Sequence, residues 1–351
     1  MTAIGLVLQG GGALGAFEWG AVKRLVELGF VPKVLTGVSI GAINTAAIAG
    51  ARQGDIIHSL DTLWREITIA TVPFLPPERQ ATLALFGNPR FYRLRTDLFN
   101  ALRWTNLCDV APMRETLAKL CDFDRLNDTR TSKVAFTATN VQTGQSVRFS
   151  NLTTRLGPDH VLASGSLPPG FPMTEIDGQM YWDGGLFDNT PLRALVEMLS
   201  PEEAENLPIF ILDLFPESDA IPTNLTQVRD RMMEISFENR FWDDFGGPAG
   251  LKDYATMLRV LDRALPKDST LRQQPAYRRM MEYRALANLH VVPAPHVPMT
   301  GGMDFSAYTV RDHHDRGYRA MSAYLAKQAI VPATRSAPQR ARREAAAVAV
   351  G

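Results

Sequence analysis

The segment that decides the fold lies at residues 4–15 and reads Ile-Gly-Leu-Val-Leu-Gln-Gly-Gly-Gly-Ala-Leu-Gly. Its apolar first half predicts a buried parallel strand that stops at three glycines. Residues 13–29 then carry apolar side chains at helical spacing and close at Gly29, so they predict a helix. A second strand at 33–38 and a helix of small residues at 40–50 follow. This alternation predicts an α/β protein with a parallel sheet.

Later segments extend the same pattern. Apolar and β-branched runs predict further strands at 133–140, 145–149, 207–214 and 288–292. Residues 174–182 predict a hairpin whose tight turn is Asp177-Gly178, and residues 224–285 have a helical composition. We therefore expect a three-layer α/β/α sandwich with a mostly parallel central sheet.

Three regions follow from these elements. We expect a catalytic core at residues 1–215 and a mainly helical part at 216–332 that packs on it and contributes the strand near 288–292. Residues 333–351 are rich in Ala and Arg without apolar periodicity, which predicts a disordered tail. The stretch 68–107 mixes prolines with aromatic residues, and it is either a cover over a site or an excursion packed on the core.

Composition narrows the class of protein. Hydrophobic residues make up 45% and charged residues 21%, which is typical of a globular protein. Lys+Arg and Asp+Glu both number 37, so no net field favours nucleic acid. Cys108 and Cys121 have no metal-site spacing, and we interpret them as reduced structural thiols. No signal peptide or membrane span is visible, so we expect a cytoplasmic location, with contact at a membrane surface left open.

The glycine run has two interpretations. Gly10, Gly12 and Gly15 fit G-x-G-x-x-G between a strand and a helix, as in a dinucleotide site. That site also needs an acidic residue at the end of the second strand, where Thr36 and Gly37 stand instead, so an oxidoreductase is a remote alternative. The same convergent N–H groups at a helix start also suit a tetrahedral oxyanion.

Ser39 stands in the pentapeptide Gly37-Val38-Ser39-Ile40-Gly41, which matches G-x-S-x-G between a predicted strand and a predicted helix. This context is typical of a nucleophile elbow. Gly37 and Gly41 let the backbone turn sharply, and the Ile40 N–H opens the helix beside the serine. We therefore interpret Ser39 as a nucleophile.

A nucleophilic serine needs a base, and two kinds are available. A Ser-His-Asp triad would take its histidine from His290, His296, His313 and His314, none of which has a distinctive setting. Asp183 offers a carboxylate base, since it ends a strand and precedes Gly184-Gly185, about which the chain can bend closely. Both possibilities stay open on these residues alone.

Together with Ala163–Pro172 and Asp183-Gly184-Gly185, the two glycine motifs make the chain resemble the patatin-like phospholipases, which are lipid acyl hydrolases with a Ser–Asp dyad. The resemblance implies that Ser39 is the nucleophile and Asp183 its base. It implies an oxyanion hole at Gly10, Gly11 and Gly12, with the Ile40 N–H as a further donor. Many members carry Arg or Lys where this chain has Leu14, which bears on the headgroup.

The expected activity is hydrolysis of lipid carboxylic esters through an acyl-enzyme, with no metal and no cofactor. Acyl transfer, hydrolysis of non-phospholipid esters and a non-catalytic binding module are alternatives. The expected partner is an acyl-ester substrate, with peripheral membrane contact left open and no nucleic acid.

Overall fold

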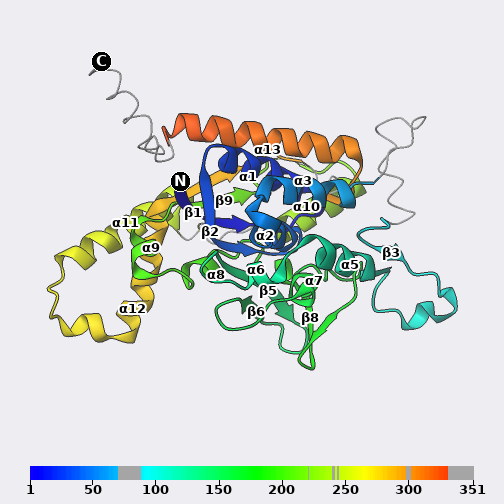
Figure 1. The fold of residues 1–351 in the computed structure, drawn as a ribbon, viewed down its shortest axis with the longest axis horizontal. Coiled ribbons are helices and arrows are strands. Elements are labelled where there is room, and N and C mark those ends of the chain that lie inside the picture. The colour runs from blue at the N-terminus through cyan, green and yellow to red at the C-terminus, as the bar shows by residue number, and fades with distance from the viewer. Residues whose placement is uncertain (70–87, 220, 239–241, 243–244, 298–301, 331–351) are drawn as a thin grey trace, which may run out of the picture.

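The computed structural model describes residues 1–351 except 70–87, 220, 239–241, 243–244, 298–301 and 331–351 (Figure 1). The predicted tail at 333–351 and much of the stretch 68–107 therefore lie outside the described residues. Within them, the chain forms a mixed α/β fold around a central, mostly parallel sheet, as the sequence predicts.

The sheet has the order β10-β9-β1-β2-β5-β8-β7, and β6 pairs with β5. Its first five strands run parallel, whereas β6, β7 and β8 join by antiparallel pairing. The bounds are β1 Thr2–Leu8, β2 Phe30–Gly37, β5 Lys133–Asn140, β6 Ser146–Ser150, β7 Thr174–Ile176, β8 Gln179–Asp183, β9 Ile209–Asp213 and β10 Leu289–Pro293. Because parallel strands end at one edge, β1 and β2 bring the two glycine motifs together there.

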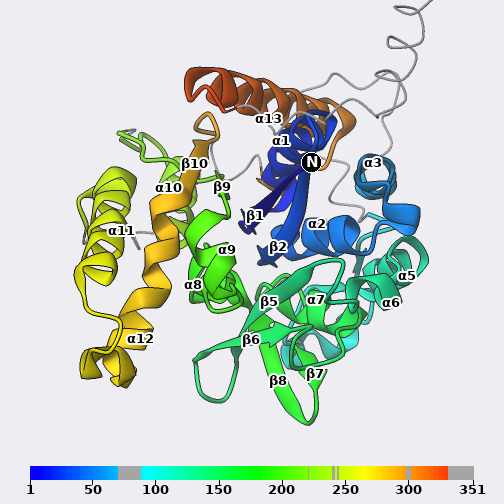
Figure 2. The ribbon, with the colours of Figure 1, turned by 60° about the vertical axis from the view of Figure 1, so that its left-hand side comes forward.

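Helices cover both faces of the sheet (Figure 2). Alternate strand residues point to opposite faces, so Leu6 and Leu8 of β1 join one apolar cluster while Val7 joins the other. On the first face lie α1 Gly15–Glu27, α2 Ile40–Ala49, α3 Ile56–Ile67, α5 Ala111–Leu120, α6 Phe123–Leu126, α7 Pro158–Ser164 and α13 Ala307–Lys327. On the second lie α8 Leu192–Val196, α9 Pro201–Asn206 and α11 Gly247–Ala264. The remaining α-helices of the described residues are α10 Leu225–Phe237 and α12 Pro275–Glu282.

The local predictions are confirmed in detail at two places. The hairpin at 174–182 is β7–β8, and its turn residues Asp177 and Gly178 both have positive φ. The strand predicted at 288–292 is β10, which adds to the sheet beside β9. The division into a core of 1–215 and a C-terminal part stays a prediction.

Helix α13 lies along α1, although about 280 residues separate them in the chain (Figure 1). Two glycines make this crossing tight. A Cβ at Gly20 would lie 1.9 Å from the carbonyl oxygen of His314, and a Cβ at Gly317 would lie 1.9 Å from that of Phe17. The helices therefore meet backbone to backbone, and no side chain fits between them.

We expect Gly20→Ala and Gly317→Ala each to lower the free energy of unfolding. Alanine raises helix propensity by about 1 kcal/mol, but forcing two packed helices apart costs about 1–3 kcal/mol or more. Denaturant titration checks the sign. Gly157→Ala is the control, because its Cβ would meet nothing within 4 Å. Unchanged midpoints in both helix variants would contradict the close packing.

Candidate active site

Ser39 lies between the end of β2 and the start of α2, where the sequence predicts a nucleophile elbow. Its backbone has φ 55° and ψ −125°, a conformation that L-residues rarely adopt. Its N–H donates to Ser164, to the carbonyl oxygen at 3.0 Å and to Oγ at 3.1 Å. The strained turn is therefore held by a neighbouring segment as well as by its own helix.

The elbow needs glycine at both flanking positions for steric reasons. A Cβ at Gly37 would lie 2.3 Å from the carbonyl oxygen of Gly41, and a Cβ at Gly41 would lie 2.3 Å from that of Leu8. The start of α2 thus rests directly on the ends of β1 and β2. This contact fixes Ser39 at the carboxyl edge of the sheet.

The glycine run after β1 lies against the same serine. A Cβ at Gly10 would be 2.9 Å from Cβ of Ser39, and Gly12 has a positive φ of 58°. Gly12 begins a short 3-10 helix, and Ile40 begins α2, so neither N–H has an acceptor within its own helix. Among the described residues, no acceptor is present for the N–H of Gly11 either.

Asn189 joins the glycine run to the Asp183 loop, a role that the sequence analysis missed. Its Oδ1 accepts from the Gly10 N–H at 3.0 Å, and its Nδ2 donates to the Gly10 carbonyl at 3.2 Å. It also lies against Gly185, where a Cβ would come within 2.9 Å of its Oδ1. The N–H of Gly10, which the family resemblance implies as an oxyanion donor, therefore already has an acceptor in this structure.

Asp183 ends β8 and is 1% exposed. Its Oδ1 accepts from the Gly185 N–H at 2.8 Å. Burial raises the pKa of the carboxyl to about 7, although hydrogen bonding from Ser39 and Gly185 opposes the shift. Ser39 is thus near enough to affect the pKa, yet Oδ2 has no hydrogen bond of ordinary geometry within the described chain. We interpret the pair as a loose contact of the kind that tightens when substrate binds.

One segment contacts both members of this pair. Ser164 accepts from Ser39, and two residues later the Ser166 carbonyl accepts from the Asp183 N–H at 3.0 Å. Ser166 is itself anchored, since its Oγ donates to the Leu162 carbonyl at 2.8 Å. The motif Ala163–Pro172 therefore sets the spacing between the serine and the carboxylate.

Three of the four candidate histidines of a triad, His290, His296 and His314, have other partners. His290 stacks on Phe210 and its pKa is lowered to about 4 by burial. His296 lies 3.3 Å from Glu234, and His314 packs on Trp19. His313 is buried, and burial lowers its pKa. No hydrogen bond among the described residues joins any of them to Ser39 or Asp183, so the carboxylate is the better candidate base.

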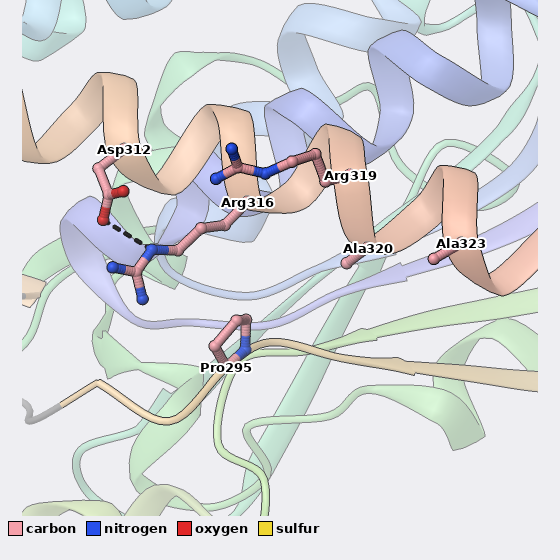
Figure 3. Close-up of a pocket in the computed structure, with 6 residues that line it drawn as sticks. All are labelled: Pro295, Asp312, Arg316, Arg319, Ala320 and Ala323. Carbon is pink, nitrogen blue, oxygen red and sulfur yellow. Dashed lines mark ion pairs between the residues drawn. The ribbon is translucent and has the colours of Figure 1, made fainter.

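A hollow of about 510 Å³ lies between α13 and Pro295, which follows β10, and none of these residues lines it (Figure 3). Its lining residues are Pro295, Asp312, Arg316, Arg319, Ala320 and Ala323. Asp312 forms an ion pair with Arg316 at 2.7 Å, and none of the lining residues is a serine, threonine or cysteine. The hollow therefore has no nucleophile with a base beside it. In the described ranges no cluster of His, Cys, Asp or Glu could hold a metal ion, and no helix there is long and apolar enough to cross a bilayer.

The fold and the site define an α/β protein with a half-buried serine beside a buried carboxyl group at the carboxyl edge of its sheet. Residues 6–196 match the family model of the patatin-like phospholipases, which is more than half of the chain. The chain belongs to the patatin-like phospholipase family.

The similarity to individual proteins is either short or low in sequence identity. A stretch of 54 residues is 41% identical to triacylglycerol lipase SDP1L of Arabidopsis thaliana, covering 15% of this chain and 7% of the lipase. VipD from Legionella pneumophila is 17% identical with a TM-score of 0.43, over 92% of this chain and 67% of VipD. The ExoU–SpcU complex from the Pseudomonas aeruginosa type III secretion system is 16% identical with a TM-score of 0.30, over 95% of this chain and 52% of that one.

We expect Asp183→Asn to stabilise the protein more at pH 8 than at pH 5, because the loss of stability begins above the ordinary carboxyl pKa and is complete only near pH 7. A carboxyl with a folded pKa of about 7 and an ordinary value of 3.8 binds its proton more tightly when folded. Stability from this group is therefore present at low pH and lost as pH rises toward the folded value, by about 1.4 kcal/mol per pKa unit. We expect a gain of about 2–4 kcal/mol at pH 8 from denaturant titration.

Asp188→Asn is the matched control, because burial raises the pKa of Asp188 only to about 6. It should show a smaller gain at pH 8. An Asp183→Asn variant that is no more stable than the parent at pH 8 would show that burial does not raise this pKa.

Proposed function

We propose that this protein is a serine hydrolase of lipid carboxylic esters that works through a Ser39–Asp183 dyad. The observation that carries the proposal is the buried Asp183 carboxyl, which lies beside a strained serine and has Oδ2 without a hydrogen bond in the described chain. Asp183 accepts the proton of the Ser39 hydroxyl as Oγ attacks the ester carbonyl. Asp183 returns this proton to the oxygen of the leaving alcohol as the C–O bond breaks, an acyl-enzyme remains, and water attacks it with Asp183 again as base.

The oxyanion of each tetrahedral intermediate would be bound by backbone N–H groups. Gly11, Gly12 and Ile40 supply these donors in the proposal, whereas Gly10 shapes the loop through Asn189. Each donor of this kind contributes on the order of 10²–10³ to turnover. The partial positive charge at the start of α2 adds to them, because the developing charge forms beside its first turn.

The substrate is proposed as a class rather than as one lipid. Membership in a family of phospholipases supports a fatty-acid ester as the substrate. The short match to a triacylglycerol lipase supports cleavage of the same type of ester bond. Leu14 is buried and leaves the glycine nest without a cation of its own. The proposal therefore specifies the carboxylic ester and leaves the headgroup unassigned.

Ser39→Ala should abolish labelling by a fluorophosphonate probe and hydrolysis of a soluble p-nitrophenyl ester. Asp183→Asn should lower kcat by about 10²–10⁴, the range typical of a lost general base. His290→Ala, His296→Ala, His313→Ala and His314→Ala should each keep most of the activity. Asp188→Asn is the control for loss of a nearby, half-buried carboxylate. If one histidine change removed activity and Asp183→Asn did not, the dyad would be wrong.

The pH dependence of kcat/KM should report the raised pKa of Asp183. The base must be ionised to accept a proton, so activity should fall about tenfold per pH unit below pH 7 and level off above it. Initial rates with a soluble ester between pH 4 and 9 measure this limb. Asp188→Asn should leave the midpoint in place. A midpoint near the ordinary carboxyl value would exclude Asp183 as a buried base.

A further inference from the structure

Residues 95–106, here named the 95–106 loop, present apolar side chains to solvent. The loop contains a short 3-10 helix, Leu98–Arg103, between strands β3 Arg93–Leu94 and β4 Cys108–Asp109. Leu98 is 70% exposed, Phe99 105% and Leu102 104%. In Figure 1 this part of the chain, in cyan, projects away from the body on the side opposite α11. Contiguous exposed apolar groups of this kind mark an interaction surface.

The loop is braced by its polar residues, so its apolar side chains are held outward. Arg95 donates to both carboxylate oxygens of Asp97, at 3.0 and 2.7 Å, and its guanidinium lies 5.0 Å from the ring of Trp104. The Asn100 N–H donates to the Asp97 carbonyl at 2.9 Å. Arg95 and Asp97 thus pair with one another within the loop, while the large side chains of Leu98, Phe99 and Leu102 face water.

The base of the loop is joined to the candidate active site. The Leu107 N–H donates to the Pro169 carbonyl at 3.0 Å, and the Cys108 N–H donates to that of Gly170 at 2.9 Å. Those acceptors belong to the motif that begins with Ser164 and Ser166, which contact Ser39 and Asp183. A surface bound by the loop would therefore lie next to the segment that spaces the dyad.

We propose that the 95–106 loop is an anchor that docks this protein on a lipid surface with anionic headgroups. The inference rests on the proposed lipid esterase function and adds the partner surface of the same site. Leu98, Phe99 and Leu102 enter the acyl region. Arg93 and Arg103 are exposed and make no ion pair among the described residues, so they face the headgroups.

The size of the cluster favours a lipid surface over a partner protein. Even at about 200 Å² for each of the three side chains, the loop offers less than the ~800 Å² that each partner contributes to a standard protein interface. A bilayer accepts a few inserted side chains, because it provides hydrocarbon on every side of them. Trp104 at the base of the loop suits the boundary between the headgroups and the acyl chains, where tryptophan is enriched.

The test is flotation of the full chain with vesicles of phosphatidylcholine, with and without about one-third phosphatidylglycerol. Phe99→Ser/Leu102→Ser should reduce binding by about tenfold or more, because both side chains lose their transfer from water to hydrocarbon. Arg93→Gln/Arg103→Gln should reduce binding only to the anionic vesicles, and less so at high salt. Both double variants should hydrolyse a soluble monomeric ester at the parent rate.

Met257→Ser/Leu261→Ser is the matched control, since these side chains are 55% and 52% exposed on α11, away from the loop. It should bind vesicles like the parent. A Phe99→Cys variant carrying an environment-sensitive dye should also shift its emission to shorter wavelength on vesicles, which tests docking without removing the other apolar groups. No shift would overturn the proposal.

Equal vesicle binding by parent and Phe99→Ser/Leu102→Ser would also overturn it and would leave a protein as the occupant of the loop. Failure of the proposed esterase function can be distinguished from failure of the anchor. A parent protein that binds vesicles through the loop but hydrolyses no ester would refute the esterase and keep the anchor, and one that hydrolyses soluble esters without binding vesicles would do the reverse.

Discussion

The rest of the structure depends on the direct contact between helix α2 and the ends of β1 and β2. The contact is made by backbone, since a Cβ at Gly41 would lie 2.3 Å from the Leu8 carbonyl oxygen. Ser39 is consequently locked in a conformation that an isolated chain would avoid, at a cost on the order of 1–3 kcal/mol. Strain of this size persists only where neighbouring groups over-determine the position, and here β1, α2 and Ser164 all do so.

A buried polar network keeps the end of β1 in place beneath this contact. The Gln9 N–H donates to Glu18 at 2.6 Å, and Gln9 Oε1 accepts from the Leu214 N–H at 2.7 Å. Glu18 also accepts from Asn44 of α2 at 2.9 Å. Glu18 is fully buried, and burial raises its pKa well above the ordinary value. Because each lost partner would leave a buried polar group unpaired, the network ties β1, β9, α1 and α2 into one arrangement.

The sequence predicted what is encoded locally. The elbow at Ser39 and the turn at Asp177-Gly178 depend on residues that adjoin in the chain. Their glycines therefore predicted both turns from the sequence alone. Asn189 was missed because its partner Gly10 lies 179 residues away, and an Asn shortly before a Pro is ordinarily a turn residue. The crossing of Gly20 and Gly317 was missed for the same reason, since nothing local shows which helix a glycine faces.

The role of base that we propose for Asp183 would account for its burial without a cation. An ordinary aspartate, with a pKa of about 3.9, is a weak base at neutral pH. The polar groups that favour its ionised form are neutral, namely the Gly185 N–H and the nearby Ser39 hydroxyl, and desolvation outweighs both. A Lys or Arg beside the carboxyl would stabilise the carboxylate and return the pKa toward its ordinary value. Basicity and stability therefore oppose each other at Asp183, and the backbone contacts around Ser39 supply the rigidity that keeps so unfavourable a charge in place.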